Sequence, residues 1–402
     1  MMASNPHKTP VYIHACGSHS ALGLTEQDIH SSLRSGIGQG MAGDTFQLND
    51  GSRVIVGRAT NPLPVITSAS PNQNTRNNQL ALSALAQISE QVEQAKATFG
   101  ADRIAVVVGS STSGISDGEV ALKHHAKNGE LPDDFNYYKQ ELSNLSDFIA
   151  DHFGLTGLHY VVSTACSSSG RVFLTAKRLL KAGLADAVIV GGADSLCALT
   201  VNGFDGLDSV SKSLCRPFGE GRDGINIGEA AAFMLLSLTP PSESDIQIAL
   251  LGAGESSDAH HISAPDPEGR GAEAAMQAAL TDAGLAASDI GYVNAHGTST
   301  PLNDAMESKA IVRVLGEHVP VSSTKPLTGH TLGAASAIEA MICWQILRHN
   351  LTLPVPAGQQ ERDPLIAPIR LVQHGDTLKQ NAILSNSFAF GGNNVCLIFG
   401  KL

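Results

Sequence analysis

The chain has 402 residues, of which 42% are hydrophobic and 16% charged, and its formal net charge is −12. This length predicts two or three lobes with a large core, which excludes a small disulfide-stabilised scaffold, and the apolar content excludes a disordered chain. The negative charge disfavours non-specific nucleic-acid binding, because it repels the phosphate backbone.

The chain shows no sign of membrane insertion or secretion. No apolar run approaches the roughly 20 residues that a membrane span needs, and the start MMASNPHKTP lacks the pattern of a secretory leader. The six cysteines have no C-x-x-C spacing, so neither a zinc site nor a disulfide framework is indicated. We expect a cytoplasmic protein that binds neither membrane nor nucleic acid.

Short β-branched runs alternate with longer amphipathic stretches. Asp50-Gly51 predicts a hairpin turn near the N-terminus, and the helical spacing of apolar residues predicts helices over 79–99 and 271–283, each ending at a glycine. This alternation predicts an α/β protein with mainly parallel sheets. The predicted strands are 11–13, 104–108, 160–162, 187–190, 246–251, 290–293, 382–384 and 395–399.

The clearest break in the chain is SLTPPSESD at 237–245, where two prolines stand among polar residues. It predicts two α/β halves, residues 1–245 and residues 246–402. No self-similarity between the halves is visible in the sequence.

The strongest local signal is YVVSTACSSSG at 160–170, followed by a predicted helix over 171–180. Cys166 therefore stands at a strand-to-helix turn, where the positive end of a helix favours a thiolate and lowers the thiol pKa. Taken alone, the segment leaves two interpretations open, a catalytic nucleophile or a buried cysteine in a serine-rich turn.

Two histidines stand at strand or loop ends among small residues, where catalytic groups are commonly placed. His296 lies in GYVNAHGTSTPLND, and His330 lies in VSSTKPLTGHTLGAASAIEA. The other thirteen histidines are interpreted as structural, and the adjacent pairs His124-His125 and His260-His261 lack further metal-ligand spacing, so no metal site is predicted. The GxGxxG pattern at 219–224 follows no strand and is rejected as a nucleotide site.

Four motifs in a fixed order, STACSSSG, NAHGTSTPLND, SSTKPLTGHTLGAA and SNSFAFGGNN, resemble the β-ketoacyl-acyl-carrier-protein synthases of the KAS I/II type, in the thiolase-like superfamily. The resemblance implies a five-layered αβαβα fold of two pseudo-symmetric halves, usually a homodimer. It also implies an acyltransferase that extends an acyl thioester by two carbons through decarboxylative Claisen condensation with malonyl-acyl-carrier protein. No cofactor is implied beyond the phosphopantetheine of the carrier.

The resemblance assigns Cys166, His296 and His330 to the Cys-His-His triad. Cys166 would hold the acyl group as a thioester, and the two imidazoles would donate hydrogen bonds to the enolate oxygen after decarboxylation. The backbone N–H groups of Cys166 and Phe390 would receive the later oxyanion. His330 separates this pattern from thiolases, which use a second cysteine, and from KAS III enzymes, which use asparagine.

Further residues match the family by position. Thr298 and Thr300 match threonines that hydrogen-bond the pantetheine arm, and Phe388 and Phe390 match a gating loop, although core packing would explain the aromatics equally well. Lys325 and Glu339 match supporting residues that either orient the site electrostatically or form a structural ion pair. The spacing Asp304-x-x-Glu307 predicts a capping box.

Two loops depart from the family pattern. The final loop reads AFGGNN rather than GFGGTN, and residues 109–114 read GSSTSG rather than GSGIGG, which leaves acyl chain length open. One alternative is a chain-length-factor-like subunit in a heterodimer with a related ketosynthase, although such subunits lack the cysteine. Another is a synthase of polyketide or polyene chains rather than fatty acids. The cationic residues considered for docking an acidic carrier are Arg76, Lys123, Lys127 and Lys212.

Overall fold

The computed structural model describes residues 10–67, 70–242, 246–359 and 361–402. The strands are β1 (Val11–His19), β2 (Met41–Gln47), β3 (Arg53–Gly57), β4 (Ile104–Gly109), β5 (His159–Val162), β6 (Ala187–Asp194), β7 (Ala230–Ser237), β8 (Ile248–Ser257), β9 (Ile290–Asn294), β10 (Pro320–Ser322), β11 (Arg370–Leu371), β12 (Ala382–Phe388) and β13 (Asn393–Lys401). The α-helices are α1 (Glu26–Ser35), α2 (Arg76–Leu85), α3 (Ser89–Phe99), α4 (Ile115–Asn128), α5 (Ser143–Phe153), α6 (Ser168–Lys181), α7 (Ala198–Asp205), α8 (Arg270–Ala283), α9 (Pro301–Leu315), α10 (Lys325–Thr328) and α11 (Ala335–His349).

Eleven strands form one sheet in the order β11-β10-β9-β12-β13-β8-β1-β7-β6-β4-β5. Two half-sheets meet where β1 pairs with β8 through Val11↔Leu250 and Tyr12↔Ala249. We call β1, β7, β6, β4 and β5 the N half, and the remaining six strands the C half. The order β8-β13-β12-β9-β10 in the C half repeats the order β1-β7-β6-β4-β5 in the N half, so the halves are pseudo-symmetric.

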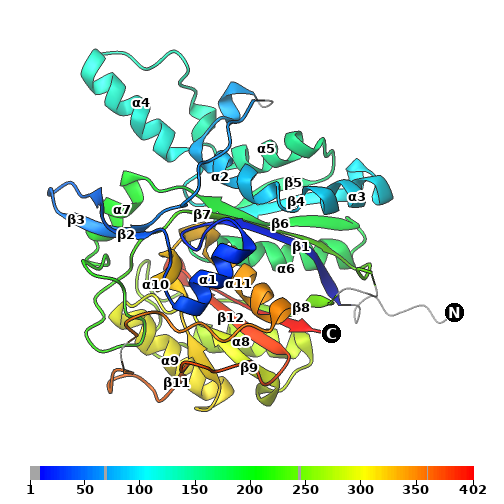
Figure 1. The fold of residues 1–402 in the computed structure, drawn as a ribbon, viewed down its shortest axis with the longest axis vertical. Coiled ribbons are helices and arrows are strands. Elements are labelled where there is room, and N and C mark those ends of the chain that lie inside the picture. Colours follow the sequence, from blue (N-terminus) through cyan, green and yellow to red (C-terminus); the bar gives the residue numbers. More distant parts are fainter. Residues whose placement is uncertain (1–9, 68–69, 243–245, 360) are drawn as a thin grey trace.

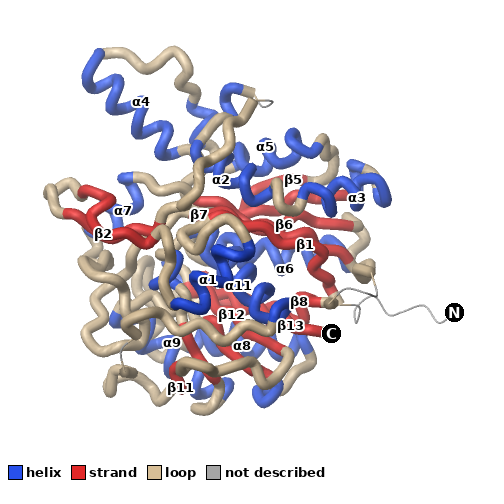
Figure 2. Tube along the Cα trace, viewed as in Figure 1, coloured by secondary structure: helices blue, strands red, loops and turns tan. Residues whose placement is uncertain are grey.

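Helices complete five layers (Figures 1 and 2). The helices α2 and α5 pack on one face of the N half, α8 packs on the outer face of the C half with α9 against it, and α6 and α11 lie between the two half-sheets. The central position of α11 explains its composition, because every residue from Ala335 to Leu347 is buried. The αβαβα layering implied by the resemblance is therefore confirmed.

The predicted strands are all present, as are the Asp50-Gly51 hairpin between β2 and β3 and the helix α8. Two predictions differ from the structure, and the strands β7, β10 and β11 were not predicted. The sheet is not mainly parallel, since the pairs β1–β7, β1–β8, β6–β7, β8–β13 and β12–β13 are antiparallel. The helix predicted over 79–99 is two helices, α2 and α3, separated by a turn at 86–88. The alanine-rich strand β7 was missed, because it is buried along its whole length and shows no alternation.

The predicted boundary at residue 245 falls within 243–245, outside the described residues, and the division into 1–245 and 246–402 stays a prediction. In the described part of the chain, no helix is both long enough and apolar enough to cross a membrane.

The helix α4 extends away from the layered body (Figures 1 and 2, upper left). Only Gly118 and Ala121 of this helix are buried, whereas Val120 and Leu122 are 66% and 61% exposed. Exposed apolar side chains on a projecting helix are typical of a surface that another chain covers.

Candidate active site

Cys166 lies between the end of β5 and the start of α6 and is only 5% exposed. The turn before it is strained, since Ala165 adopts φ 52°. Gly109 at the end of β4 explains how the turn fits, because a Cβ there would lie 2.5 Å from the backbone nitrogen of Ser169. The strand end and the helix start therefore approach each other closely, and the thiol is held in a buried corner.

The two predicted histidines face this thiol. His330 Nε2 lies 3.0 Å from Cys166 Sγ, and the rings of His296 and His330 meet edge to face with centroids 5.4 Å apart. One ring nitrogen of each histidine and the sulfur all lie within 4.8 Å of one another. The fold thus brings together three residues that are far apart in the sequence.

Backbone contacts fix His330 in place. Its N–H donates to the carbonyl of Asn226 (2.6 Å), and its own carbonyl accepts from the N–H of Gly228 (3.0 Å). A side chain at Gly329, where φ is 69°, would collide with Gly228. This glycine contact lets the two loops lie directly against each other.

Burial sets the charge state of the resting site. It raises the pKa of Cys166 to about 12, opposed by the charge of Lys325 and by the backbone N–H groups of Phe390 and Cys166. It also lowers the pKa of His296 and His330 well below the usual value, with Lys325 acting in the same direction. The thiol pKa is therefore raised rather than lowered as expected at a helix N-terminus, because burial disfavours the thiolate. At rest the site holds a neutral thiol beside two neutral imidazoles.

Lys325 and Glu339 lie directly behind the histidines, and both are almost fully buried. Lys325 Nζ lies 2.5 Å from Glu339 Oε1 and also donates to the carbonyl oxygen of His296. Burial raises the pKa of Glu339, and the Lys325 charge opposes that shift. The ion pair therefore joins α10 and α11 to the loop that carries His296.

The capping box predicted from Asp304-x-x-Glu307 is wrong, because α9 begins at Pro301 and both carboxylates point into the core. Glu307 accepts the N–H groups of His296 (2.8 Å) and Gly297 (2.7 Å). Asp304 accepts the N–H groups of Phe218 (2.7 Å) and Ser299 (3.1 Å). The sequence did not predict that Glu307 fixes the loop that carries His296. The signal for this role was an acidic residue at helical spacing among the apolar residues of α9.

A cavity of about 230 Å³ leads to Cys166, His296 and His330. Thr298 and Thr300 line it, with their hydroxyl oxygens 2.8 Å apart. Phe388 and Phe390 also line it. The ring of Phe388 lies 6.1 Å from that of His296, and the ring of Phe390 lies 5.5 Å from that of Phe204. Every residue that the sequence placed at the pantetheine channel or the gate therefore borders this cavity.

A second missed residue, Asp194, shapes the loop 109–114. One of its carboxylate oxygens accepts four hydrogen bonds at 2.8–2.9 Å, from the Ser110 and Thr112 hydroxyls and from the Ser111 and Thr112 backbone N–H groups. Ser111 Oγ in turn lies 3.4 Å from the carbonyl of Ala165, which precedes the nucleophile. Among the residues that differ from GSGIGG, Thr112 gives this buried carboxylate a hydroxyl donor, and Ser111 reaches it only through its backbone N–H.

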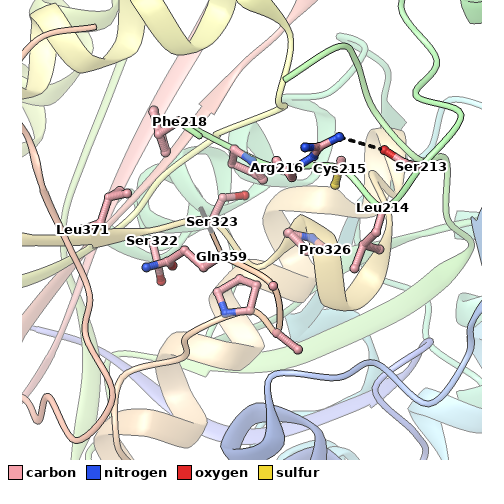
Figure 3. A pocket seen from close by; sticks show the side chains of 14 residues that line it. Ser213, Leu214, Cys215, Arg216, Phe218, Ser322, Ser323, Pro326, Gln359 and Leu371 are labelled. Atoms are coloured by element: carbon pink, nitrogen blue, oxygen red, sulfur yellow. Dashed lines mark hydrogen bonds between the residues drawn. The ribbon is translucent and has the colours of Figure 1, made fainter. Parts of the chain in front are cut away.

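A separate cavity of about 240 Å³ lies beside the loop 213–218 (Figure 3). Arg216 and Gln359 line it, and Arg216 Nη2 lies 3.4 Å from Ser213 Oγ. The walls include Ser323 and Pro326, which flank Lys325, but none of the predicted site residues.

Comparison with known proteins agrees with this geometry. The β-ketoacyl synthase N-terminal domain matches residues 9–240, and the β-ketoacyl synthase C-terminal domain matches residues 248–358. The chain is 34% identical over 317 residues to 3-oxoacyl-[acyl-carrier-protein] synthase 2 of Staphylococcus aureus, covering 75% of this chain and 76% of the relative. It is also 34% identical over 307 residues to nodulation protein E of Rhizobium meliloti, covering 75% and 76%.

Among solved structures, one chain of a complex from Xenorhabdus doucetiae, formed by a ketosynthase (ApeO) and its chain length factor (ApeC), is 45% identical with a TM-score of 0.93. Both this chain and that chain are covered completely. A β-ketoacyl synthase from Burkholderia phymatum is 28% identical with a TM-score of 0.82, covering 98% of this chain and 100% of the other. Domains, relatives and solved structures agree, and the chain belongs to the β-ketoacyl synthase family.

Proposed function

We propose that this chain is a β-ketoacyl-acyl-carrier-protein synthase that extends an acyl thioester by two carbons through decarboxylative Claisen condensation. The observation that carries the proposal is the 3.0 Å contact between Cys166 Sγ and His330 Nε2. The His296 ring meets the His330 ring edge to face, and all three residues line a cavity of about 230 Å³.

In the first half-reaction, the Cys166 sulfur attacks the carbonyl of an acyl thioester. The thiol proton passes to the departing carrier thiol, and the acyl group stays on Cys166. The backbone N–H groups of Phe390 and Cys166 would stabilise the oxyanion formed in this step, and both residues line the cavity.

In the second half-reaction, a malonyl thioester loses carbon dioxide and becomes an enolate. Neutral imidazoles suit this step because each can donate one N–H to the enolate oxygen, and burial keeps both His296 and His330 neutral. The enolate carbon then attacks the Cys166 thioester, and the cysteine leaves as a thiolate that takes a proton from water. The product is a β-ketoacyl thioester on the carrier.

The proposed substrates arrive on phosphopantetheine, and the chemistry requires no other cofactor. Thr298 and Thr300 are placed to hydrogen-bond the amides of that arm, since their hydroxyls border the cavity. All six cysteines are unpaired, which fits a reducing compartment such as the cytoplasm.

We also propose that the chain pairs with a second ketosynthase-like subunit, either a copy of itself or a chain length factor, and that it receives substrate from an acyl carrier protein. The outer edge of β5 has no paired strand among the described residues, and α4, which follows β4 along the chain, exposes Val120 and Leu122. One similar structure is a ketosynthase bound to its chain length factor. Leu122→Asp should weaken pairing, measured by sedimentation, whereas Leu184→Asp, at a similarly exposed position (65%), should not.

Intact-protein mass spectrometry tests the central step. Incubation with acyl-carrier protein or acyl-CoA should add one acyl group to the wild-type chain and none to Cys166→Ala. Unchanged labelling of Cys166→Ala would remove the nucleophile assignment. His330→Ala should accept the acyl group in part while losing malonyl decarboxylation, and equal loss of both steps would contradict the division of roles.

A second candidate function, a non-condensing chain-length subunit, is distinguished by turnover of the purified chain alone. The GSSTSG loop beside Ala165 and the AFGGNN gate motivate an assay across saturated, polyene and polyketide acyl chains. Elongation of ordinary saturated chains only would place the enzyme in fatty acid synthesis.

A further inference from the structure

A cluster of metal-ligating side chains lies where α1 meets the C-terminal end of α11, apart from the active site. Glu26 and His30 stand one turn apart on α1, and Gln345 and His349 stand one turn apart on α11. Figure 1 shows α1 (dark blue) beside the end of α11 (orange). Two helices thus bring two pairs of polar side chains face to face.

The distances within this cluster are short. His30 Nε2 lies 2.8 Å from Gln345 Oε1, His349 Nε2 lies 3.5 Å from Glu26 Oε2, and the two imidazole centroids are 4.6 Å apart. One ligand atom from each of Glu26, His30 and His349 lies within 4.8 Å of the other two. His349 Nε2 is itself shielded from solvent and makes no hydrogen bond in the described residues.

Two imidazoles and a carboxylate are ligands that zinc and its neighbours in the first transition row prefer. Ligand atoms on a tetrahedral ion with bonds of about 2.1 Å lie roughly 3.4 Å apart. Small side-chain rotations reach that spacing, because Glu26 is exposed and both histidines are partly exposed. Gln345 steadies the His30 ring by its hydrogen bond, as outer partners of metal-bound histidines do.

The end of α11 attracts a cation, while the charge of Arg348 opposes one at His349. His349 is the last residue of α11, where the helix dipole is negative. The nearest basic side chain on this helix, Arg348, is placed over the ring of Trp344 at 5.1 Å. This cluster is not visible in the sequence, since His30 and Gln345 are 315 residues apart.

We propose that Glu26, His30 and His349 bind one divalent ion of the Zn²⁺, Ni²⁺ and Cu²⁺ class, which clamps α1 onto the end of α11. Glu339 precedes His349 by ten residues, about 15 Å along the helix. The ion therefore stays clear of the reacting atoms and has a structural role.

Trp344 provides a direct readout. It is the only tryptophan in the chain, it is 7% exposed, and its ring lies 6.4 Å from that of His349. Because Cu²⁺ quenches indole fluorescence at short range, titration of Cu²⁺ into tag-free protein should quench Trp344 saturably at one ion per chain. Zn²⁺ should reverse the quenching by competition. His30→Ala and His349→Ala should each weaken binding about tenfold or more.

Matched controls keep the test decisive. His125→Ala removes an exposed histidine from α4, within the pair His124-His125, and should leave the titration unchanged. His30→Gln covers the case in which His30→Ala folds poorly. In the absence of metal it should melt like wild type, but it should lack the rise in melting temperature that Zn²⁺ gives the wild type. Acylation of Cys166 should be the same in all these variants.

Three results would overturn the proposal. They are non-saturable quenching, equal affinity in His349→Ala and wild type, and loss of binding in His125→Ala instead. None of them bears on the condensing activity, which is measured separately at Cys166.

Discussion

Lys325 combines two roles in one ammonium group, since it pairs with Glu339 at 2.5 Å and donates to the carbonyl of His296. Removing one partner of a buried pair leaves an uncompensated charge, which costs about 3–5 kcal/mol. Glu339→Leu should therefore lower the free energy of unfolding by about that amount in urea titrations. The double variant Lys325→Met/Glu339→Leu should regain much of it, and simple additivity of the two single changes would contradict this account. If the double variant folds stably but acylates slowly, the pair serves the site as well as the fold.

Glu307 is the acidic residue whose titration should be visible in stability measurements. Burial raises its pKa to about 7 from an ordinary 4.5, opposed by the backbone N–H groups of Gly297 and His296. Between those pH values the folded protein binds a proton that the unfolded chain has released, so this group makes the unfolding free energy fall as pH rises. In Glu307→Gln the fall across this window should be smaller, by up to roughly 3 kcal/mol. Equal pH slopes in urea titrations of the two proteins would refute this contribution.

The loop between β12 and β13 is the element that carries the Phe390 N–H to the nucleophile. Gly391 and Gly392 have φ of 81° and 75°, but a Cβ on Gly391 has room, whereas one on Gly392 would lie 2.9 Å from Asp258 Cβ. Gly391→Ala thus adds only backbone strain, about 1 kcal/mol, while Gly392→Ala must also shift the loop. Loss of one oxyanion donor costs about a hundred- to a thousandfold in rate. Single-turnover acylation should slow toward that range in Gly392→Ala and less than tenfold in Gly391→Ala, and the opposite ranking would contradict the loop's role.

At the scale of elements, the sequence predicted what local pattern encodes and missed what packing decides. β4 and β6 were visible as β-branched runs. β7 begins with three alanines and has no strand pattern of its own, so it forms a strand only because both of its faces are buried in the fold. Cys166, His296 and His330 were found because small residues surround them. Glu307 and Asp194 were not, because their partners are backbone N–H groups of distant loops that only the fold brings near. Arg76 shows the same limit, since the sequence does not reveal that its guanidinium pairs with buried Glu229 at 2.5 Å.

At the scale of the whole molecule, a net charge of −12 opposes docking of an acidic carrier, so attraction has to come from a local patch. Among the cationic residues considered, Lys212 is exposed and lies three residues after Ser209, which lines the cavity to Cys166. Lys123 and Lys127 stand instead on the projecting α4, whose apolar side chains suit a partner subunit.

Lys212→Glu should therefore raise the KM for carrier-bound substrate several-fold and leave kcat nearly unchanged, because it weakens encounter rather than chemistry. Lys379→Glu is the matched control. It precedes β12 at the end opposite Phe388, about 20 Å away along the strand, and is also exposed. Added salt should raise the wild-type KM toward that of Lys212→Glu, since screening removes the same attraction. A KM that falls with salt would mean that the net repulsion of two acidic proteins governs docking and that no local patch overcomes it.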